Sequence, residues 1–151
     1  MEMLSLSFKR LAAVFSDIEL PAYSTKDSSG MDIRAALMED MVIESGGIAM
    51  VPTNLAVELP KGFEIQVRPR SGLAAEHGVT VLNTPGTIDA DYRGEIKIIL
   101  ANLGKNHFTI KRGDRIAQMV IGKVYQAQII EVDTISDTER GENGFGSSGV
   151  K

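Results

Sequence analysis

The chain has 151 residues, a hydrophobic fraction of 43% and a formal net charge of −4, which together suit a single domain with its own core. It has no cysteine and only two histidines, which excludes disulfides and thiolate chemistry and leaves hard, oxygen-held cations as the metals to expect. The negative charge argues against nucleic-acid and anionic-membrane partners, and no apolar run approaches the ~20 residues of a membrane span.

The N-terminal residues lack the pattern of a signal peptide, because an acid comes early and the apolar run is broken. We therefore expect a soluble, cytoplasmic protein, with an organelle or the nucleus left open. Residues 7–15 alternate loosely and predict an opening strand, and a polar loop follows over residues 20–30.

The next segments predict more short strands. Residues 31–36 alternate between apolar and polar types, as in a half-buried strand. On its polar face, Asp32 and Arg34 could form a local pair, or Asp32 could orient water around a metal ion. Residues 41–59 hold short apolar runs that glycines and a proline separate, and residues 60–62 predict a turn into a strand over 63–68.

The segment after Ser71 has the best helix composition in the chain and ends at Gly78. Ser71 is a plausible N-cap, and His77 is expected to be a helix-end residue rather than a ligand or base. A helix that begins here would offer backbone N–H groups, a hydroxyl and Arg70 to an anion. The alternative is an ordinary capped helical turn with a surface arginine.

The stretch over residues 83–95 is the most polar hairpin candidate, with turn residues at both ends. The spacing of Asp89 and Asp91 predicts that both carboxylates lie on the same side of an extended segment, where each would raise the pKa of the other. Arg93 could pair with one of them and leave the other for chemistry. The alternative is a polar loop in a β protein.

The rest of the chain adds strands and a glycine-rich end. Strands are predicted over residues 79–82, 95–100, 108–110, 115–121 and 124–132. Gln118 lies within an apolar run, so its amide needs backbone or ligand partners. Residues 140–149 have the composition of a disordered end, but they also carry an arginine, a phenylalanine and two serines, the parts of a flap.

Strands that follow one another without long helices indicate an all-β antiparallel sandwich or jelly roll with one short helix. Neither common glycine-rich phosphate loop is present. Scattered arginines at positions 70, 115 and 140, a candidate base and a stackable phenylalanine instead point to a nucleotide phosphate ester.

Five segments in order resemble the motifs of the trimeric dUTP diphosphatases (dUTPases) along nearly the whole chain. They are residues 30–35, 68–74, 83–95, 115–118 and 140–149. One departure is Asn143, where the family usually has glycine. The resemblance implies a jelly-roll domain over residues 1–136 and a flexible arm over residues 137–151 that closes a neighbouring subunit's site.

The resemblance also implies a homotrimer whose active sites are shared between subunits, with dUTP, dUMP and pyrophosphate as its ligands. The reaction would be Mg²⁺-dependent hydrolysis of dUTP to dUMP and pyrophosphate, which keeps uracil out of DNA and supplies dUMP for thymidylate synthesis. Asp89 would be the general base, and Asp32 would act on Mg²⁺ through water. Arg115 would pair near the site in a structural role.

The implied substrate-binding residues fall into three groups. Asn83 and the backbone of Gly86, Thr87 and Ile88 would bind uracil, with Tyr92 under the deoxyribose. Phosphates would be held by Arg70, Ser71, Gly72 and Gln118, and the arm would add Arg140, Phe145, Gly146, Ser147 and Ser148.

Two other functions remain open at this point. One is an enzyme related to dCTP deaminase, which would need an added carboxylate base for the cytosine amine. The other is a non-catalytic nucleotide-binding regulator, against which the candidate base and the intact fifth motif argue.

Overall fold

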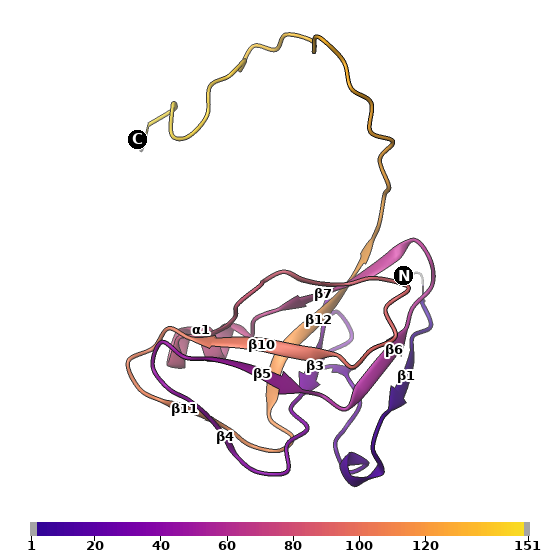
Figure 1. The fold of residues 1–151 in the computed structure, drawn as a ribbon, viewed down its shortest axis with the longest axis vertical. Helices are drawn as coiled ribbons and strands as arrows, with labels where there is room; N and C mark the ends of the chain where they lie inside the picture. The colour runs from indigo at the N-terminus through magenta and orange to yellow at the C-terminus, as the bar shows by residue number, and fades with distance from the viewer. Residues whose placement is uncertain (1–2, 150–151) are drawn as a thin grey trace.

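The computed structural model describes residues 3–149, so the last two residues of the expected arm lie outside the described part. Figure 1 shows a β body from which the C-terminal segment leads away. The elements, in chain order, are β1 (Ser7–Arg10), η1 (Ala13–Phe15), β2 (Ala22–Tyr23), β3 (Gly30–Arg34), β4 (Met41–Ile43), β5 (Ile48–Pro52), β6 (Leu55–Glu58), β7 (Phe63–Arg68), α1 (Ser71–His77), β8 (Val79–Val81), β9 (Gly86–Ile88), β10 (Lys97–Asn102), β11 (Phe108–Ile110) and β12 (Arg115–Lys123).

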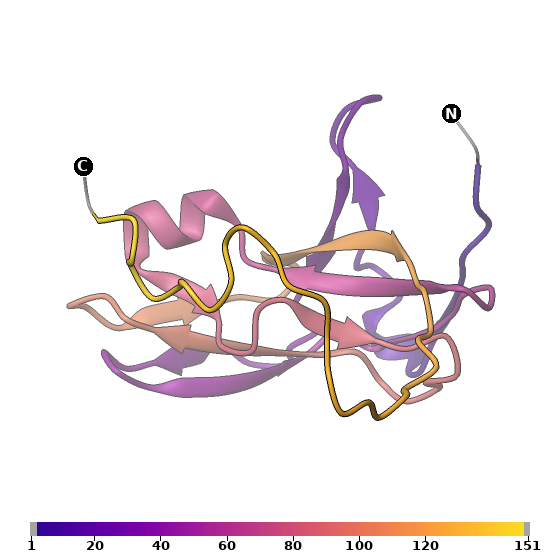
Figure 2. The same cartoon turned by 90° about the horizontal axis from the view of Figure 1, so that it is seen from above.

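The strands form antiparallel sheets, which confirms the predicted all-β class with one short α-helix. The largest sheet has five strands in the order β2-β3-β12-β7-β9, and a second has three in the order β5-β10-β8. Two further pairs, β1-β6 and β11-β4, complete the described body. The two larger sheets lie in different layers in the view from above (Figure 2).

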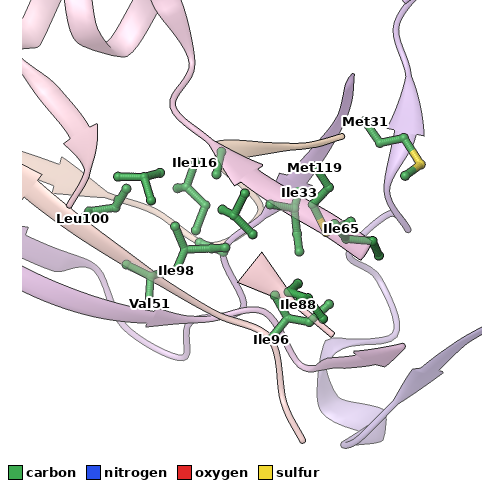
Figure 3. Close-up of a cluster of buried hydrophobic side chains, with 14 of the residues drawn as sticks. Met31, Ile33, Val51, Ile65, Ile88, Ile96, Ile98, Leu100, Ile116 and Met119 are labelled. Atoms are coloured by element: carbon green, nitrogen blue, oxygen red, sulfur yellow. The ribbon is translucent and has the colours of Figure 1, made fainter. Parts of the chain in front are cut away.

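The core collects the inward-facing residues of both larger sheets (Figure 3). Ile33, Ile65 and Met119 come from the five-stranded sheet, while Val51 and Ile98 come from the three-stranded sheet. All five are at most 1% exposed. Burying a side chain of this size contributes about 1.5–3 kcal/mol, so the alternation along each strand fixes which residues face outward to form a site.

The short helix α1 ends where the sequence predicts and begins differently. Gly78 adopts a left-handed conformation with φ of 69°, and its N–H donates to the carbonyls of Leu73 and Ala74. Arg70 is the extended N-cap and makes no side-chain capping bond, so the prediction of Ser71 as N-cap is wrong. Among residues 3–149, no helix is long and apolar enough to cross a membrane.

The strands predicted over residues 31–36 and 95–100 are shifted to Gly30–Arg34 and Lys97–Asn102, and two other predicted strands differ more. The opening strand stops at Arg10 because the next backbone N–H groups, of Leu11 and Ala12, donate to Asn54 instead of to a strand neighbour. The strand predicted over residues 124–132 is absent from the described structure, where the last strand ends at Lys123. Its apolar side chains are exposed and meet no neighbouring strand within this chain.

The segment around η1 is attached to the body by Arg10, which donates to the carbonyls of Phe15 and Ile18, and by an ion pair between Asp17 and Arg112. The Arg112 guanidinium donates to both carboxylate oxygens of Asp17, at 3.1 and 2.6 Å, and also lies 4.8 Å from the centre of the Phe15 ring. Hydrogen bonding to Arg112 lowers the pKa of Asp17 below its usual value, although partial desolvation opposes the shift. Folding therefore favours the ionised carboxylate.

We expect Asp17→Asn to lower the free energy of unfolding slightly at neutral pH. Because the pKa of Asp17 is lower in the folded state than in the unfolded state, its stabilisation is complete above the unfolded pKa of about 4 and is lost as the pH falls through the folded value. Denaturant unfolding of parent and variant from pH 7 to pH 2 should show a gap that closes in acid. Asp133→Asn, in the exposed tail, is the control and should show no gap.

Candidate functional site

The hairpin after β8 forms one wall of a pocket of about 400 Å³. Six of the sequence-predicted site residues line it, namely Asn83, Gly86, Thr87, Ile88, Asp89 and Tyr92. The opposite wall comes from the segment that enters β10 and from β10 itself, including Glu95, Lys97 and Ile99. Met50 of β5 also contributes. No motif marks this wall in the sequence, although the alternation along β10 places Lys97 and Ile99 on one face.

Gly86 allows the close approach of three segments in this pocket. A Cβ atom at Gly86 would lie 3.2 Å from Nδ2 of Asn83 and 3.3 Å from Cβ of Val67, both tighter than ordinary contact. Gly86 is paired with Val67 in the β7–β9 ladder. Gly86 thus lets the Asn83 amide lie against the hairpin backbone. The polar edge of a planar ligand ring could contact both the amide and this backbone.

Asp89 lies where β9 ends and a turn begins. Tyr92 N–H donates to the Asp89 carbonyl at 3.1 Å, and the Asp89 side chain is exposed. In the described part of the chain, its carboxylate has no ion-pair or hydrogen-bond partner from a side chain. An exposed, unpaired carboxylate at a pocket wall can accept a proton from water.

The predicted arrangement of Asp89, Asp91 and Arg93 is wrong. Residues 90–91 form a turn rather than an extended segment, so the two-residue spacing does not place both carboxylates on one side of a strand. Arg93 donates to the carbonyls of Ala90 and Tyr92, and its guanidinium lies 4.0 Å from Glu58. The Arg93 guanidinium is therefore paired with carbonyls of its own turn and with the Glu58 carboxylate of β6, and not with Asp89 or Asp91.

The hydroxyl end of the Tyr92 ring is held by two contacts. Its hydroxyl donates to the Glu95 carbonyl at 2.9 Å. A Cβ atom at Gly94 would lie within 2.6 Å of Cζ of Tyr92. Gly94 therefore provides the space in which the Tyr92 ring lies, and the ring remains about half exposed at the pocket.

A second cluster gathers around Asp32, whose side chain is only 12% exposed. Arg115 Nη1 donates to Asp32 Oδ2 at 3.1 Å, and Arg70 Nε lies 3.3 Å from Oδ1. The expected structural pairing of Arg115 is thus found. The predicted local pair of Asp32 with Arg34 is wrong, because Arg34 pairs with Glu19 at 2.9 Å and donates to the Gly113 carbonyl.

The same cluster contains Gln118, and α1 begins next to it. In the register of β12, Gln118 lies opposite Asp32 on β3 and opposite Arg68 on β7. A Cβ atom at Gly30 would lie 2.8 Å from Oε1 of Gln118, so Gly30 makes room for this amide. Ser71 and Gly72 are exposed at the first turn of α1, with open space around Gly72. Cationic and amide donors are thus available to an anion here.

The fifth-motif residues lie on the C-terminal segment, away from both clusters (Figure 1). Residues 124–149 contain no helix or strand, and Arg140, Phe145, Gly146, Ser147 and Ser148 are all exposed. Arg140 donates to the Asn143 carbonyl at 2.8 Å. Left-handed backbone occurs at Phe145 and Gly146 and not at Asn143, so the asparagine occupies an ordinary backbone position here.

Oxygen donors for a metal ion are sparse in a single chain. Within residues 3–149, no group of three or more His, Cys, Asp or Glu side chains could hold an ion. The buried Asp32 Oδ1 and Arg70 Nε lie 3.3 Å apart, yet neither has an aligned hydrogen-bond partner among the described residues, so both atoms can still take a further polar ligand. A buried, unsatisfied carboxylate oxygen is costly, and a water molecule on a hydrated cation would satisfy it.

Comparisons with known proteins agree on one family. A dUTPase family model matches residues 16–149. The deoxyuridine 5'-triphosphate nucleotidohydrolase of Neorickettsia sennetsu is 57% identical over 135 residues, which cover 89% of this chain and 91% of that protein. The protein of the same name from Beijerinckia indica is 58% identical over 143 residues, with 93% and 89% covered.

Solved structures give the same result. A variant of the Staphylococcus bacteriophage 80alpha dUTPase, solved with dUpNHpp, matches with a TM-score of 0.85 at 28% identity and covers 97% of this chain and 99% of that one. A dUTPase variant from phage phi11 of S. aureus, described with a structural Mg(II) ion, matches with a TM-score of 0.77 at 23% identity, covering 88% and 99%.

Proposed function

Because this chain belongs to the dUTPase family and hydrolyses dUTP to dUMP, we propose that its hairpin pocket binds the nucleoside and that Asp89 is the general base. The observation that carries this proposal is that Asn83, Asp89 and Tyr92 border a single pocket. The jelly-roll fold of the family accounts for their arrangement, since a hairpin at a sheet edge presents its turn residues together.

The chemistry follows from the positions of these side chains. The Asn83 amide and the backbone of residues 86–88 offer donors and acceptors to the uracil edge. The Tyr92 ring supports the deoxyribose. Asp89 takes a proton from water, the water oxygen forms a bond to phosphorus, and the α–β anhydride bond breaks to release dUMP and pyrophosphate.

The triphosphate is strongly anionic, and the chain has a net charge of −4. Its phosphates therefore need a local group of cationic and hydrogen-bond-donating residues. We propose that Arg70, Ser71, Gly72 and Gln118 bind phosphate oxygens, and that Asp32 holds Mg²⁺ through water at its unsatisfied Oδ1. Bound Mg²⁺ would neutralise phosphate charge. Arg115 keeps Asp32 in place, because its hydrogen bond occupies the other carboxylate oxygen.

We further propose a homotrimer with active sites shared between subunits. Arg70 lines a different pocket from Asn83 and Asp89, and the arm residues lie on neither in this chain. Large apolar side chains are also exposed on β5, at Ile48 and Met50, directly after β8, at Leu82, and along the tail at Tyr125 and Ile129. Contiguous exposed apolar surface is typical of association.

In this assembly, residues 137–151 form an arm that closes a neighbour's site. Arg140, Ser147 and Ser148 would bind the γ end of the triphosphate, with the backbone of Gly146, and Phe145 would stack on uracil. Phe145 is fully exposed in the single chain, so its ring is free to stack on a base in a neighbour's site. Closure excludes water and strengthens every phosphate contact, since the same charges interact more strongly at lower dielectric.

A substrate panel tests the proposal. With Mg²⁺ and, separately, dUTP, UTP, dCTP and dTTP, we expect pyrophosphate from dUTP at a rate at least about 100-fold above the others, because mismatched buried polar groups are costly. Pyrophosphate and ammonia are both measured. Ammonia from dCTP would show a deaminase instead, and dUTP binding without product would show a regulator. Omission of Mg²⁺ should sharply lower the rate.

A further inference from the structure

The turn between β5 and β6 holds the backbone on which Tyr92 depends, although it lies outside the five motifs. Thr53 and Asn54 form this turn and are 2% and 4% exposed. The Thr53 hydroxyl donates to the Ile96 carbonyl at 2.6 Å. The Asn54 N–H donates to the Glu95 carboxylate at 3.1 Å. The turn therefore hydrogen-bonds to two successive residues, Glu95 and Ile96, directly before β10.

Leu55, the residue after the turn, adds a third hydrogen bond to this segment. Ile96 N–H donates to the Leu55 carbonyl at 2.8 Å, so both polar backbone groups of Ile96 are bound by residues 53–55. The Ile96 side chain lies beside Ile88 in the core (Figure 3) and is 2% exposed. The segment at residues 95–96 is thus fixed both by its backbone and by its side chain.

The turn itself is held on its other side. Asn54 adopts a left-handed conformation with φ of 61°. Its side chain exchanges two hydrogen bonds with the Ala12 backbone, at 2.7 and 3.0 Å, and its carbonyl accepts from Leu11 N–H at 3.0 Å. These bonds link the end of β1 to the turn, which makes it a rigid support.

Tyr92 receives this rigidity through a single bond. Its hydroxyl donates to the carbonyl of Glu95. The Glu95 carboxylate accepts from Asn54 N–H, and the carbonyl of the next residue, Ile96, accepts from the Thr53 hydroxyl. The Tyr92 ring cannot shift toward the backbone, because it already occupies the space of a missing Cβ atom at Gly94. The position of the Tyr92 ring in the pocket therefore depends on the position of residues 95–96.

We propose that Thr53 is a positioning residue that sets the discrimination between deoxyribose and ribose by fixing Tyr92. This inference rests on the proposed role of Tyr92 beneath the sugar. Exclusion of a 2'-hydroxyl requires that the Tyr92 ring leave no space for one additional oxygen atom on the sugar. This close fit is lost when the backbone that supports the ring relaxes. The Asp89 carbonyl accepts from Tyr92 N–H, but no hydrogen bond joins the Asp89 carboxylate to the 53–54 turn or to residues 95–96 among the described residues, so proton abstraction should change less than sugar discrimination.

The test compares Thr53→Val with Thr53→Ser. Valine has the shape of threonine but leaves the buried Ile96 carbonyl without its donor, whereas serine keeps the hydroxyl. We expect Thr53→Val to lower the ratio of kcat/KM for dUTP to that for UTP by about tenfold. The kcat for dUTP should stay within about twofold, and Thr53→Ser should restore the ratio. A lower Tm with an unchanged ratio would overturn the proposal.

Two further measurements separate this inference from the proposed function. Tyr92→Ala removes the ring, and an unchanged ratio in this variant would overturn both the role of Tyr92 and the inference. A lowered ratio in Tyr92→Ala with an unchanged ratio in Thr53→Val would overturn the inference alone. The chain has three tyrosines, so ring signals of tyrosine-labelled protein can be followed by NMR. Thr53→Val should shift the Tyr92 signals, and unshifted Tyr92 signals would also overturn the inference.

Discussion

Asp89→Asn should bind dUTP with nearly parental affinity and lose about 10²- to 10⁴-fold in kcat, the range that a general base contributes. Asparagine keeps the size and the polar contacts of aspartate but cannot accept a proton from water. The carboxylate is exposed at the pocket wall and has no ion-pair partner among the described residues, so its loss leaves no unpaired cation behind. Binding can be measured by calorimetry and turnover by pyrophosphate release.

The matched control is Asp91→Asn, the same chemical change two residues along the chain. Asp91 borders a neighbouring surface hollow rather than the nucleoside pocket, and its side chain is exposed. It should therefore retain turnover within about twofold. Turnover of Asp89→Asn within a few-fold of the parent would contradict the assignment of the base, and an equal loss in both variants would indicate a general effect of charge on the hairpin.

Removal of residues 140–151 should lower turnover of dUTP at least about 100-fold while the assembly stays intact, since misplacement of reacting groups alone costs this much. The segment carries the phosphate-binding candidate Arg140 and the ring of Phe145, and none of its described residues belongs to a sheet of the body. Its removal should therefore leave the fold unchanged. Sedimentation and steady-state kinetics measure the two effects separately.

Point variants show which part of the arm matters. Phe145→Ala removes the ring and should raise KM for dUTP, whereas Phe145→Tyr keeps a stackable ring and should resemble the parent. Arg140→Lys keeps the charge but loses the fork that can bind two phosphate oxygens at once. An unchanged rate after removal of the whole segment would contradict closure by the arm.

Local chemistry accounts for the parts of the fold that the sequence predicts well. The alternation over residues 31–36 and 63–68 matches β3 and β7, because side chains of a strand point alternately to two faces. Gly78 ends α1 as expected, since glycine adopts the left-handed conformation there without strain. The hairpin residues 83–92 also meet around one pocket, because they are neighbours along the chain.

Contacts between distant residues account for the failures. Asp32 meets Arg115, 83 positions away, and no local pattern distinguishes that partner from Arg34, which is nearby on the same strand. Arg93 is satisfied by carbonyls of its own turn, which depend on a turn geometry that spacing does not reveal. The apolar residues 124–132 have the composition of a strand but find no strand to pair with in this chain.

The separation of the arm from the hairpin pocket has a genetic consequence. If base, phosphate ligands and arm of each site come from different copies, a chain with a defective base can still lend a working arm to its neighbour, and the reverse also holds. Activity in a mixed population would then not fall in proportion to the fraction of defective chains. Two different null alleles could restore partial function together, although neither supports it alone.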